Sequence, residues 1–439
     1  MKILYVSQYF PPEMGAPAAR ASELAHHWAA AGNDVSVLTG FPNHPTGVVP
    51  AEWRPRLRRL IYRERISVEP ESAEVRGPKQ ARPIQVFRTW LWPLPNRKPH
   101  ERMRNYASFC ISAGLRGLAL PRPDVIIATS PQLLVALAGW WLAFARKIPF
   151  VFEVRDLWPE SLTAVGIGDE DSLLHRVLAG LAGFLYERAD LIVVVTPAFR
   201  DYLIEHWRVP AEKLAVVENG VETDLFAPRS EAGDRALRRE LRVDLAGRKD
   251  KFIVCYVGTM GMAHGLETLL DAAAELLREK AEIMFLLIGE GTDKARIKSL
   301  AQTRHLTNIR FLDQQPRERI PGFVSASDAC LVLLKKTDVF KTVIPTKMLE
   351  FMSCARPVIV GVGGQARQIV EEAHAGIAIE PENAKELAQA IVQLANDPNV
   401  GRTLGQHGRE YIRQTLSREQ TATKYIEILN RFSKQKPLP

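Results

Sequence analysis

Short apolar runs alternate with helix-like segments along most of the 439-residue chain. The apolar runs are rich in Val, Ile and Phe and are bounded by Gly, Pro, Asn or Asp, which is typical of buried strands. Strands that alternate with helices form parallel sheets with helices on both faces, so the pattern predicts an α/β fold. The runs that we interpret as strands are residues 3–7, 34–40, 124–129, 150–154, 191–196, 252–258, 283–289, 309–312, 329–334, 357–362 and 376–379.

Two domains are expected from the length of the chain and from one interruption of this pattern. A chain of 439 residues is long for a single core. Residues 229–251 are polar and charged and carry no strand pattern. We therefore expect a first domain over residues 1–228, a linker over residues 229–251 and a second domain that begins at residue 252.

The segment from Ile344 to Val360 combines a short helix with a buried strand. Pro345 suits the first turn of that helix, because its missing N–H group would be unpaired there in any case. Lys347 and Glu350 lie three residues apart, hence on one helical face, with the cation nearer the end where backbone N–H groups favour an anion. This arrangement suits a ligand with phosphates at one end and sugar hydroxyls at the other. The alternative is an ordinary helix–strand connection with a solvated Lys–Glu pair.

The sequence PTKMLEFMSCARPVIV over residues 345–360 resembles the nucleotide-sugar signature of retaining glycosyltransferases of family 4. Nearly the whole chain resembles the branch of that family that builds bacterial surface polysaccharides, with colanic-acid-type and amino-fucosyl transferases as the nearest look-alikes. The resemblance implies the GT-B fold, in which two Rossmann-like, doubly wound parallel-sheet domains face each other across a cleft. Residues 1–228 would then bind the acceptor, residues 252–415 would bind the nucleotide sugar, and residues 416–439 would form a helix that crosses back to the first domain.

A loop over residues 10–17 joins the first strand to a helical pattern over residues 18–31. Gly15, at the entrance to this helix, lets the backbone approach a ligand, and the N–H groups that follow can bind an anion. The resemblance implies that Gly15 and Ala16 contact the donor diphosphate, with Arg20 as a further contact. Any α/β protein can begin in this way, so a purely structural loop is the alternative.

In the second domain, the resemblance implies substrate contacts at glycine turns and on the helix of the signature. The implied residues are Gly258, Thr259, His264, Gly289, Glu290, Gly291, Thr346 and Leu349. Thr259 and His264 stand where the family usually has an arginine and a lysine, and Thr342 stands where its first glutamate is usual. We therefore expect the charge near the diphosphate to come from Lys347 and Lys341, together with backbone N–H groups.

Arg155 and Asp156 directly follow the strand over residues 150–154. The family commonly has His-Asp at this position, facing the donor sugar. Asp156 matches that pattern and is expected to contact the sugar, whereas Arg155 departs from it, and a structural Arg–Asp pair is the alternative. The catalytic residues implied by the resemblance are Asp156, Arg155, Lys347 and Glu350, with Glu350 holding the ribose hydroxyls.

The chain is basic, with a formal net charge of +8 and a pI near 9.3, which indicates acidic partners. Arginines interleave with Trp, Tyr and Leu over residues 53–63 and again over residues 90–104. We refer to residues 53–104 as the basic–aromatic region. Such a composition suits an anionic membrane surface. It could also bind single-stranded nucleic acid, or form a solvated basic loop. We expect the membrane surface as partner and no nucleic acid.

The sequence predicts no metal and no cofactor other than the sugar nucleotide itself. The four cysteines are far apart and lack metal-ligand spacing, which indicates reduced thiols in a cytosolic protein. The acidic run at residues 169–171 precedes a helical pattern, where acidic residues cap a helix, so we reject a metal site there. Early prolines argue against a signal peptide, and the apolar stretch over residues 133–145 is too short to span a bilayer. We expect a cytoplasmic protein, peripheral on the inner face of the plasma membrane.

Together with these features, the family resemblance implies a glycosyltransferase that moves a sugar from a nucleoside diphosphate to a lipid-linked saccharide, with retention and without metal, in lipopolysaccharide or capsule biosynthesis. A UDP-linked donor is favoured, and a deoxy-amino sugar is a candidate. Three alternatives stay open. Residues 361–366 fit the G-x-G-x-x-A pattern of a nicotinamide dehydrogenase, with Glu380 placed to bind a ribose. A nucleotide-sugar epimerase would share the two-domain outline, and an inactive sugar-nucleotide-binding relative would explain the missing glutamate, arginine and lysine.

Overall fold

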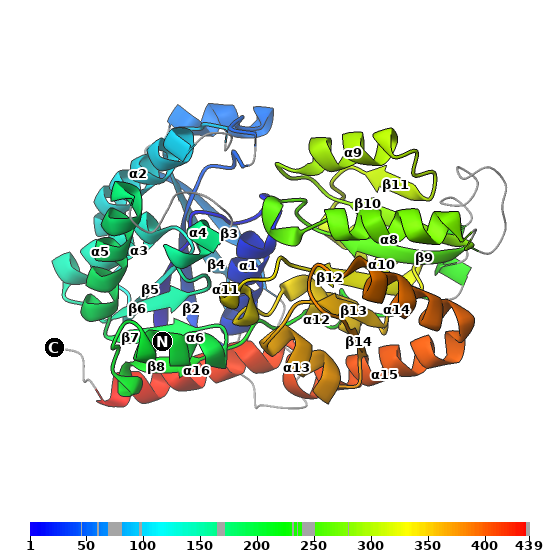
Figure 1. Ribbon diagram of the computed structural model, residues 1–439. Helices are drawn as coiled ribbons and strands as arrows, with labels where there is room; N and C mark the ends of the chain where they lie inside the picture. Colours follow the sequence, from blue (N-terminus) through cyan, green and yellow to red (C-terminus); the bar gives the residue numbers. More distant parts are fainter. Residues whose placement is uncertain are drawn as a thin grey trace. The chain divides into compact units, whose positions relative to one another are not determined.

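The chain forms two compact units in the computed structural model, which describes residues 1–44, 46–58, 61–68, 81–95, 99–164, 172–230, 232–234, 236–238, 251–279 and 281–435 (Figure 1). The first unit comprises Met1–Asn219 together with Arg418–Pro439, and the second comprises Gly220–Ser417. The chain thus leaves the first unit earlier than the residue-228 boundary that we expected, and residues 220–228 belong to the second unit. Each unit is described here by itself.

The first unit is built on an eight-stranded sheet, counted over its described residues, in the order β3-β4-β2-β1-β5-β6-β7-β8. Neighbouring strands pair in parallel except β3 and β4, which are antiparallel. The strands are β1 (Lys2–Val6), β2 (Asp34–Gly40), β3 (Ile61–Ile66), β4 (Ile84–Thr89), β5 (Val125–Thr129), β6 (Phe150–Val154), β7 (Leu191–Val194) and β8 (Leu214–Val216).

Helices cover both faces of this sheet. The helices are α1 (Ala16–Ala30), α2 (Pro99–Arg116), α3 (Leu133–Arg146), α4 (Glu160–Ala164), α5 (Leu173–Arg188), α6 (Pro197–Glu205) and α16 (Arg418–Gln435), with 3-10 helices η1 (Ala51–Arg58), η2 (Gly117–Ala119) and η3 (Ala211–Lys213). Helices α1 and α16 pack on one face, where Trp28 and Tyr425 join a core with Ile3 and Tyr5 of β1. Helix α3 packs on β5 through Gly139, where a Cβ would lie only 2.4 Å from the Cβ of Ala128.

The second unit contains a six-stranded, wholly parallel sheet in its described part, in the order β11-β10-β9-β12-β13-β14. The strands are β9 (Phe252–Val257), β10 (Ile283–Ile288), β11 (Ile309–Leu312), β12 (Ala329–Leu333), β13 (Val358–Gly361) and β14 (Gly376–Ala378). The helices are α8 (Glu267–Arg278), α9 (Lys294–Thr303), α10 (Ile320–Ser325), α11 (Asp338–Lys341), α12 (Thr346–Ser353), α13 (Gln365–Glu372), α14 (Ala384–Asn396) and α15 (Pro398–Thr415), with 3-10 helices η4 (Met262–His264) and η5 (Arg317–Arg319).

The predicted α/β fold with two doubly wound, Rossmann-like units is confirmed, and each predicted strand corresponds to an observed one. In both sheets the strand order reverses beside the first strand, between β1 and β5 in the first unit and between β9 and β12 in the second. Ligands of such sheets bind at this reversal, beyond the carboxyl ends of the strands. The candidate sites are therefore the loops that follow these strands.

Residues 42–104 contain more regular structure than the sequence indicated, because β3 and β4 form an antiparallel pair at the edge of the first sheet. Arginine at the centre of this pair concealed the strand pattern. Arg88 of β4 is buried, and its guanidinium donates hydrogen bonds to Glu64 of β3 at 2.8 Å and to the carbonyl oxygen of Gly40 at 3.2 Å. A charged residue whose donors are satisfied in this way can occupy a core position.

The C-terminal helix α16 lies on α1 and completes the core of the first unit. Trp28 of α1 is 0% exposed, its ring centre lies 5.1 Å from that of Tyr425, and its Nε1–H donates to the carbonyl oxygen of Ala422 at 3.2 Å. Arg418 at the start of α16 pairs with Glu23 of α1 at 2.8 Å. The last helix is therefore held by an aromatic contact at its centre and an ion pair at its beginning.

We predict that Trp28→Ala lowers the free energy of unfolding of the first unit by about 3–5 kcal/mol, because it leaves a cavity between α1 and α16. Urea denaturation followed by circular dichroism measures the change. The matched control is Trp92→Ala, a surface tryptophan that is 50% exposed, for which we expect about 1 kcal/mol or less. Equal losses for the two variants would contradict this account of the core.

Candidate functional site

Two glycine loops meet at the carboxyl ends of β9 and β10. A Cβ on Gly289 would lie 2.0 Å from the carbonyl oxygen of Gly258, and a Cβ on Gly291 would lie 2.2 Å from that of Met260. The N–H group of Met260 donates to the carbonyl oxygen of Glu290 at 2.8 Å. The loops thus pack backbone against backbone, which only glycine permits. The structure brings together Gly258, Gly289 and Gly291, three of the residues that the resemblance implied as substrate contacts.

Lys347, near the start of α12, points its ammonium group at this pair of loops. Its Nζ lies 4.0 Å from the centre of the Tyr256 ring, and a Cβ on Gly258 would be 3.8 Å from Nζ. This nitrogen is buried and has no hydrogen-bond partner among the described residues. Burial lowers the pKa of Lys347 to about 7, although Glu350 one turn away favours the charged form. A buried amine without a hydrogen-bond partner fits a site for an anionic ligand, which would favour its charged form.

His264 and Thr259, which stand where the family usually has charged residues, supply no positive charge here. Burial, and then the charge of Lys347, lower the pKa of His264 to about 3, so its imidazole is neutral near pH 7. Its Nδ1 lies 3.3 Å from the carbonyl oxygen of Leu333, and the carbonyl oxygen of Thr259 accepts a hydrogen bond from Tyr256 at 2.6 Å. Lys347 is therefore the residue whose side-chain nitrogen the structure places beside Gly258.

Glu350 lies on the same helix as Lys347 but pairs with an arginine that the sequence analysis missed. Arg317 Nη1 lies 2.9 Å from Glu350 Oε1, and the Arg317 guanidinium covers the ring of Phe226 at 4.9 Å. Arg317 and Glu350 are 33 residues apart, so no local pattern could connect them. The Arg317 guanidinium thus fixes the orientation of the Glu350 carboxylate before any ligand hydroxyl binds to it.

Three further predicted residues lie at the same end of the sheet in different settings. Thr346 is the first residue of α12 and is partly exposed, whereas the side chain of Leu349 is fully buried in the core. The Glu290 carboxylate is bound by Lys294 Nζ at 2.6 Å, and the same ammonium lies 2.7 Å from Asp313. Leu349 can therefore act on a ligand only through the position of its helix.

In the first unit, Gly15 caps α1 and Ala16 begins it. Gly15 has φ +132°, which disfavours any residue with a Cβ. Its carbonyl oxygen accepts the hydrogen bond of Ala19 at 3.0 Å, so the helix starts directly after it. The N–H groups of the first turn are the donors that the sequence analysis assigned to a diphosphate.

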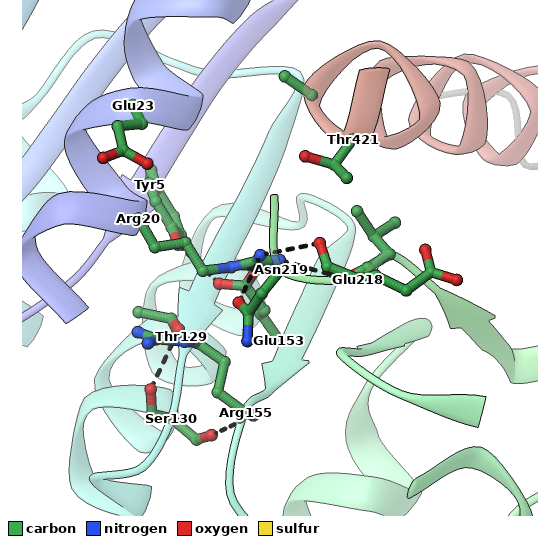
Figure 2. Close-up of polar contacts among 12 residues, drawn as sticks. Tyr5, Arg20, Glu23, Thr129, Ser130, Glu153, Arg155, Glu218, Asn219 and Thr421 are labelled. Carbon is green, nitrogen blue, oxygen red and sulfur yellow. Dashed lines mark hydrogen bonds and ion pairs between the residues drawn. The ribbon is translucent and has the colours of Figure 1, made fainter. Parts of the chain in front are cut away.

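Arg20 on α1 is enclosed within the first unit, and all five of its N–H groups have acceptors there (Figure 2). Nε and Nη2 donate to Glu153 Oε1 at 2.9 and 2.7 Å, and Nη1 donates to Asn219 Oδ1 at 3.0 Å. The remaining acceptors are the carbonyl oxygens of Glu218 and Val217. Arg20 thus ties α1 to β6 and to the segment after β8, and none of its N–H groups is left for a diphosphate in this structure.

Glu153, which the sequence analysis passed over, is the buried anion at the centre of this cluster. The hydroxyl of Tyr5 donates to Glu153 Oε2 at 2.6 Å. Burial alone would raise the pKa of Glu153, but the charges of Arg20 and Arg155 hold that pKa below its ordinary value. A single acid inside the apolar strand FVFEV was the signal in the sequence.

Arg155 directly follows the carboxyl end of β6 and lies near Ser130 (Figure 2), and Asp156 is the next residue in the chain. The Ser130 hydroxyl accepts the backbone N–H groups of Arg155 at 2.7 Å and of Asp156 at 3.4 Å, which fixes this turn. Nε and Nη1 of Arg155 are buried without a partner in the described part of the chain. Burial raises the pKa of Asp156 to about 6, against the opposing effect of Arg155. Both side chains therefore lie at the end of a strand, and their charges are only partly balanced by neighbouring groups.

The glycine pattern that suggested a dehydrogenase has a packing role. Gly364 has φ +65°, and a Cβ there would lie 2.1 Å from the carbonyl oxygen of Lys341. Glu380, the proposed ribose-binding acid, pairs with Arg367 at 2.9 Å and with Lys336 at 3.7 Å. The pattern is explained by the close approach of two backbones.

Metal ligands do not gather in the described ranges, where no three His, Cys, Asp or Glu side chains could hold an ion together. The acidic run at residues 169–171, which the sequence analysis interpreted as a helix cap, lies outside the described residues.

The solved structures to which this chain is similar include glycosyltransferases. The chain is similar to sucrose-phosphate synthase from Thermosynechococcus elongatus, with a TM-score of 0.74, 22% identity and 99% of each chain covered. It is also similar to Alr3699/HepE of Anabaena, solved in complex with UDP-glucose, with a TM-score of 0.68, 19% identity, and 98% of this chain and 100% of that chain covered. The fold is the GT-B fold of glycosyltransferases.

Two family models match the chain in succession. "Glycosyl transferase 4-like domain" matches residues 15–220, and "Glycosyl transferases group 1" matches residues 238–411. The putative colanic acid biosynthesis glycosyl transferase WcaI of Escherichia coli (strain K12) is 26% identical over 444 residues, which covers 97% of this chain and 99% of that protein. The chain belongs to the family 4 type of GT-B glycosyltransferases and is a transferase, which confirms the family and the fold that the resemblance implied.

We predict that Glu153→Gln lowers the free energy of unfolding of the first unit by about 3–5 kcal/mol, because Arg20 and Arg155 would remain buried beside a neutral amide. Chemical denaturation at pH 7 measures the change. The control is Glu187→Gln at the exposed end of α5, for which we expect about 0.5 kcal/mol or less. A Glu153→Gln protein as stable as the parent would show that this carboxylate does not hold the cluster together.

Proposed function

We propose that this glycosyltransferase takes its sugar from a nucleoside diphosphate that binds the second unit beyond the carboxyl ends of β9 and β10. The observation that carries the proposal is the buried ammonium of Lys347, which lies beside Gly258 with no hydrogen-bond partner in the described ranges. A diphosphate would supply the missing anion, and the glycine loop would let its oxygens approach the backbone. Alr3699/HepE, solved with UDP-glucose, supports this choice of donor.

The chemistry of transfer places its greatest demand on the leaving group. As the bond between the sugar and the diphosphate breaks, negative charge grows on the phosphate oxygens, so the site needs fixed donors and cations aimed at them. Lys347 and the N–H groups of the loops after β9 and β10 provide such donors. Neutral His264 adds no charge. We propose that this arrangement works without a metal, and that a phosphate oxygen accepts the proton of the acceptor hydroxyl, with retention at the anomeric carbon.

Asp156 is our candidate for a direct contact to the donor sugar, with Arg155 beside it and the start of α1 at Gly15 as a second phosphate-binding element. The partly compensated charges at the end of β6 support this role, because their polar groups are the ones that a ligand would satisfy. Glu350, oriented by Arg317, is the candidate for the ribose hydroxyls.

For the acceptor we propose a lipid-linked saccharide at the inner face of the plasma membrane, in the biosynthesis of a cell-surface polysaccharide. The similarity to WcaI, whose name refers to colanic acid biosynthesis, supports this class of product. We expect UDP as the carrier, and a deoxy-amino sugar is the donor sugar to test first.

A panel of radiolabelled nucleotide sugars, incubated with the protein and a bacterial lipid extract, tests the proposal. We expect label to enter the lipid fraction from one UDP-sugar, equally with and without EDTA. A change of the donor sugar without any acceptor would instead identify an epimerase. Binding of the nucleotide without transfer, across all donors and extracts, would identify an inactive relative.

We predict that binding of UDP at pH 8 takes up a proton, because a Lys347 with pKa about 7 is mostly neutral in the free protein and becomes charged beside a phosphate. Affinity should therefore fall as the pH rises above 7. Calorimetry in two buffers with different heats of ionisation measures the uptake.

Lys347→Met should abolish this proton uptake and weaken UDP binding by about tenfold or more. Lys385→Met, at an exposed position on α14, is the matched control and should retain both properties. If the Lys347→Met protein binds UDP as tightly as the parent, Lys347 is not the phosphate ligand.

A further inference from the structure

Helices α2, α3 and α5 form a contiguous layer on the first unit (Figure 1). Gly139 lets α3 sit directly on β5, and Phe152 of β6 lies 5.8 Å from Tyr186 of α5, measured between ring centres. Gly114 of α2 lies against Trp141 of α3, with a Cβ position 3.1 Å from the indole. The inner side of the layer is thus used to cover the sheet.

The outer side of the same layer is also apolar, although it is exposed. Leu115 and Phe144 are 63% and 65% exposed, and no charged residue occurs in α3 before Arg146. We call the exposed side chains Ile111, Leu115, Trp141, Phe144, Leu173 and Val177 the apolar helical face. Large exposed apolar areas of this kind mark interaction surfaces.

Aromatic contacts make this face continuous from one helix to the next. The rings of Trp140 and Phe144 stack within α3 at 5.5 Å, and Trp140 meets Phe184 of α5 edge-on at 4.8 Å. Trp141 reaches α2 at Gly114. The face therefore extends over three helices as one surface rather than as scattered side chains.

Cations border the apolar helical face. Arg146 donates to the carbonyl oxygens of Gly117 and Leu120 at 3.1 and 2.9 Å, and Arg122 donates to that of Arg146 at 2.7 Å, which fixes both guanidinium groups at one edge. Further basic residues on the three helices and their ends include Arg102, Arg104, Arg116, Lys147, Arg176 and Arg188. A broad apolar surface with a basic border complements an anionic bilayer, in which phosphates lie above the acyl chains.

The basic–aromatic region at residues 53–104 is less suited to that role than its composition indicated. Trp53 is only 7% exposed, and the guanidinium groups of Arg56 and Arg88 lie 4.7 and 4.5 Å from the centre of its ring. These arginines stack on a buried tryptophan. Trp90 and Trp92 are the tryptophans of this region that are exposed.

We propose that the apolar helical face docks the first unit on the surface of an anionic phospholipid bilayer. In the described ranges, no helix combines the length and apolar character that crossing a bilayer would need. In the proposed docked state the three helices lie along the interface, with Phe144 and Trp141 among the acyl chains and the bordering arginines at the phosphates. The inference deepens the proposed function by naming the surface that meets the membrane of its lipid-linked acceptor.

Vesicle flotation tests the inference, with phosphatidylcholine vesicles made with and without phosphatidylglycerol. We expect the full-length protein to float with the anionic vesicles at low salt and to release at high salt. The double variant Leu115→Glu/Phe144→Glu should bind about a hundredfold more weakly, about tenfold for each apolar side chain lost from the interface. The control Trp92→Glu, at an exposed position of the basic–aromatic region, should float as the parent does.

Three outcomes would overturn the inference: a double variant that floats like the parent, a Trp92→Glu protein that alone loses binding, or a parent that is dimeric and binds no vesicles while the double variant is monomeric. Both altered positions are exposed, so folding is checked simply by an unchanged melting temperature. Calorimetry with UDP on the same proteins separates the two proposals. Vesicle binding without UDP binding would refute the proposed donor and leave the membrane surface standing.

Discussion

Parallel strand pairing is the constraint on which both units depend, because it places the carboxyl ends of the strands along one edge of each sheet. Loops that are far apart in the sequence are therefore brought together at this edge. In the second unit this edge joins Gly258 to Gly289 and brings Lys347 against them. In the first unit it collects Ser130, Arg155 and the start of α1. The candidate site residues of both units are therefore concentrated in the loops at the carboxyl ends of the strands.

Charge compensation separates structural polar groups from those available to a ligand. Arg20 and Glu153 are both buried, yet each has its hydrogen bonds satisfied inside the fold, with Tyr5 completing the set. Lys347 is in the opposite situation, since its Nζ is buried with only an aromatic face beside it among the described residues. A fold tolerates such a group where binding of an anion recovers the lost stabilisation. The contrast explains why two basic residues that the family resemblance assigns to the donor behave differently here.

The same distinction applies to apolar side chains. Helix α3 places Gly139 against the sheet, while Trp141 and Phe144 are 41% and 65% exposed. Core packing accounts for the first set but leaves the second partly exposed to solvent. The exposed set continues across α2 and α5 and is bordered by arginines, which is the arrangement that lies flat on a charged interface.

The sequence by itself determined the alternation of strands and helices, the helix that carries Lys347 and Glu350 on one face, and the glycines at the ends of strands, because each depends on neighbouring residues and on backbone periodicity. It indicated the family for the same reason. Only the tertiary structure decided that Arg20 is bound by Glu153, 133 residues away, and that Glu350 is bound by Arg317. It also decided that Trp53 is buried while Phe144 is exposed. Burial and ion pairing depend on which distant segments pack together, and this cannot be predicted from local composition.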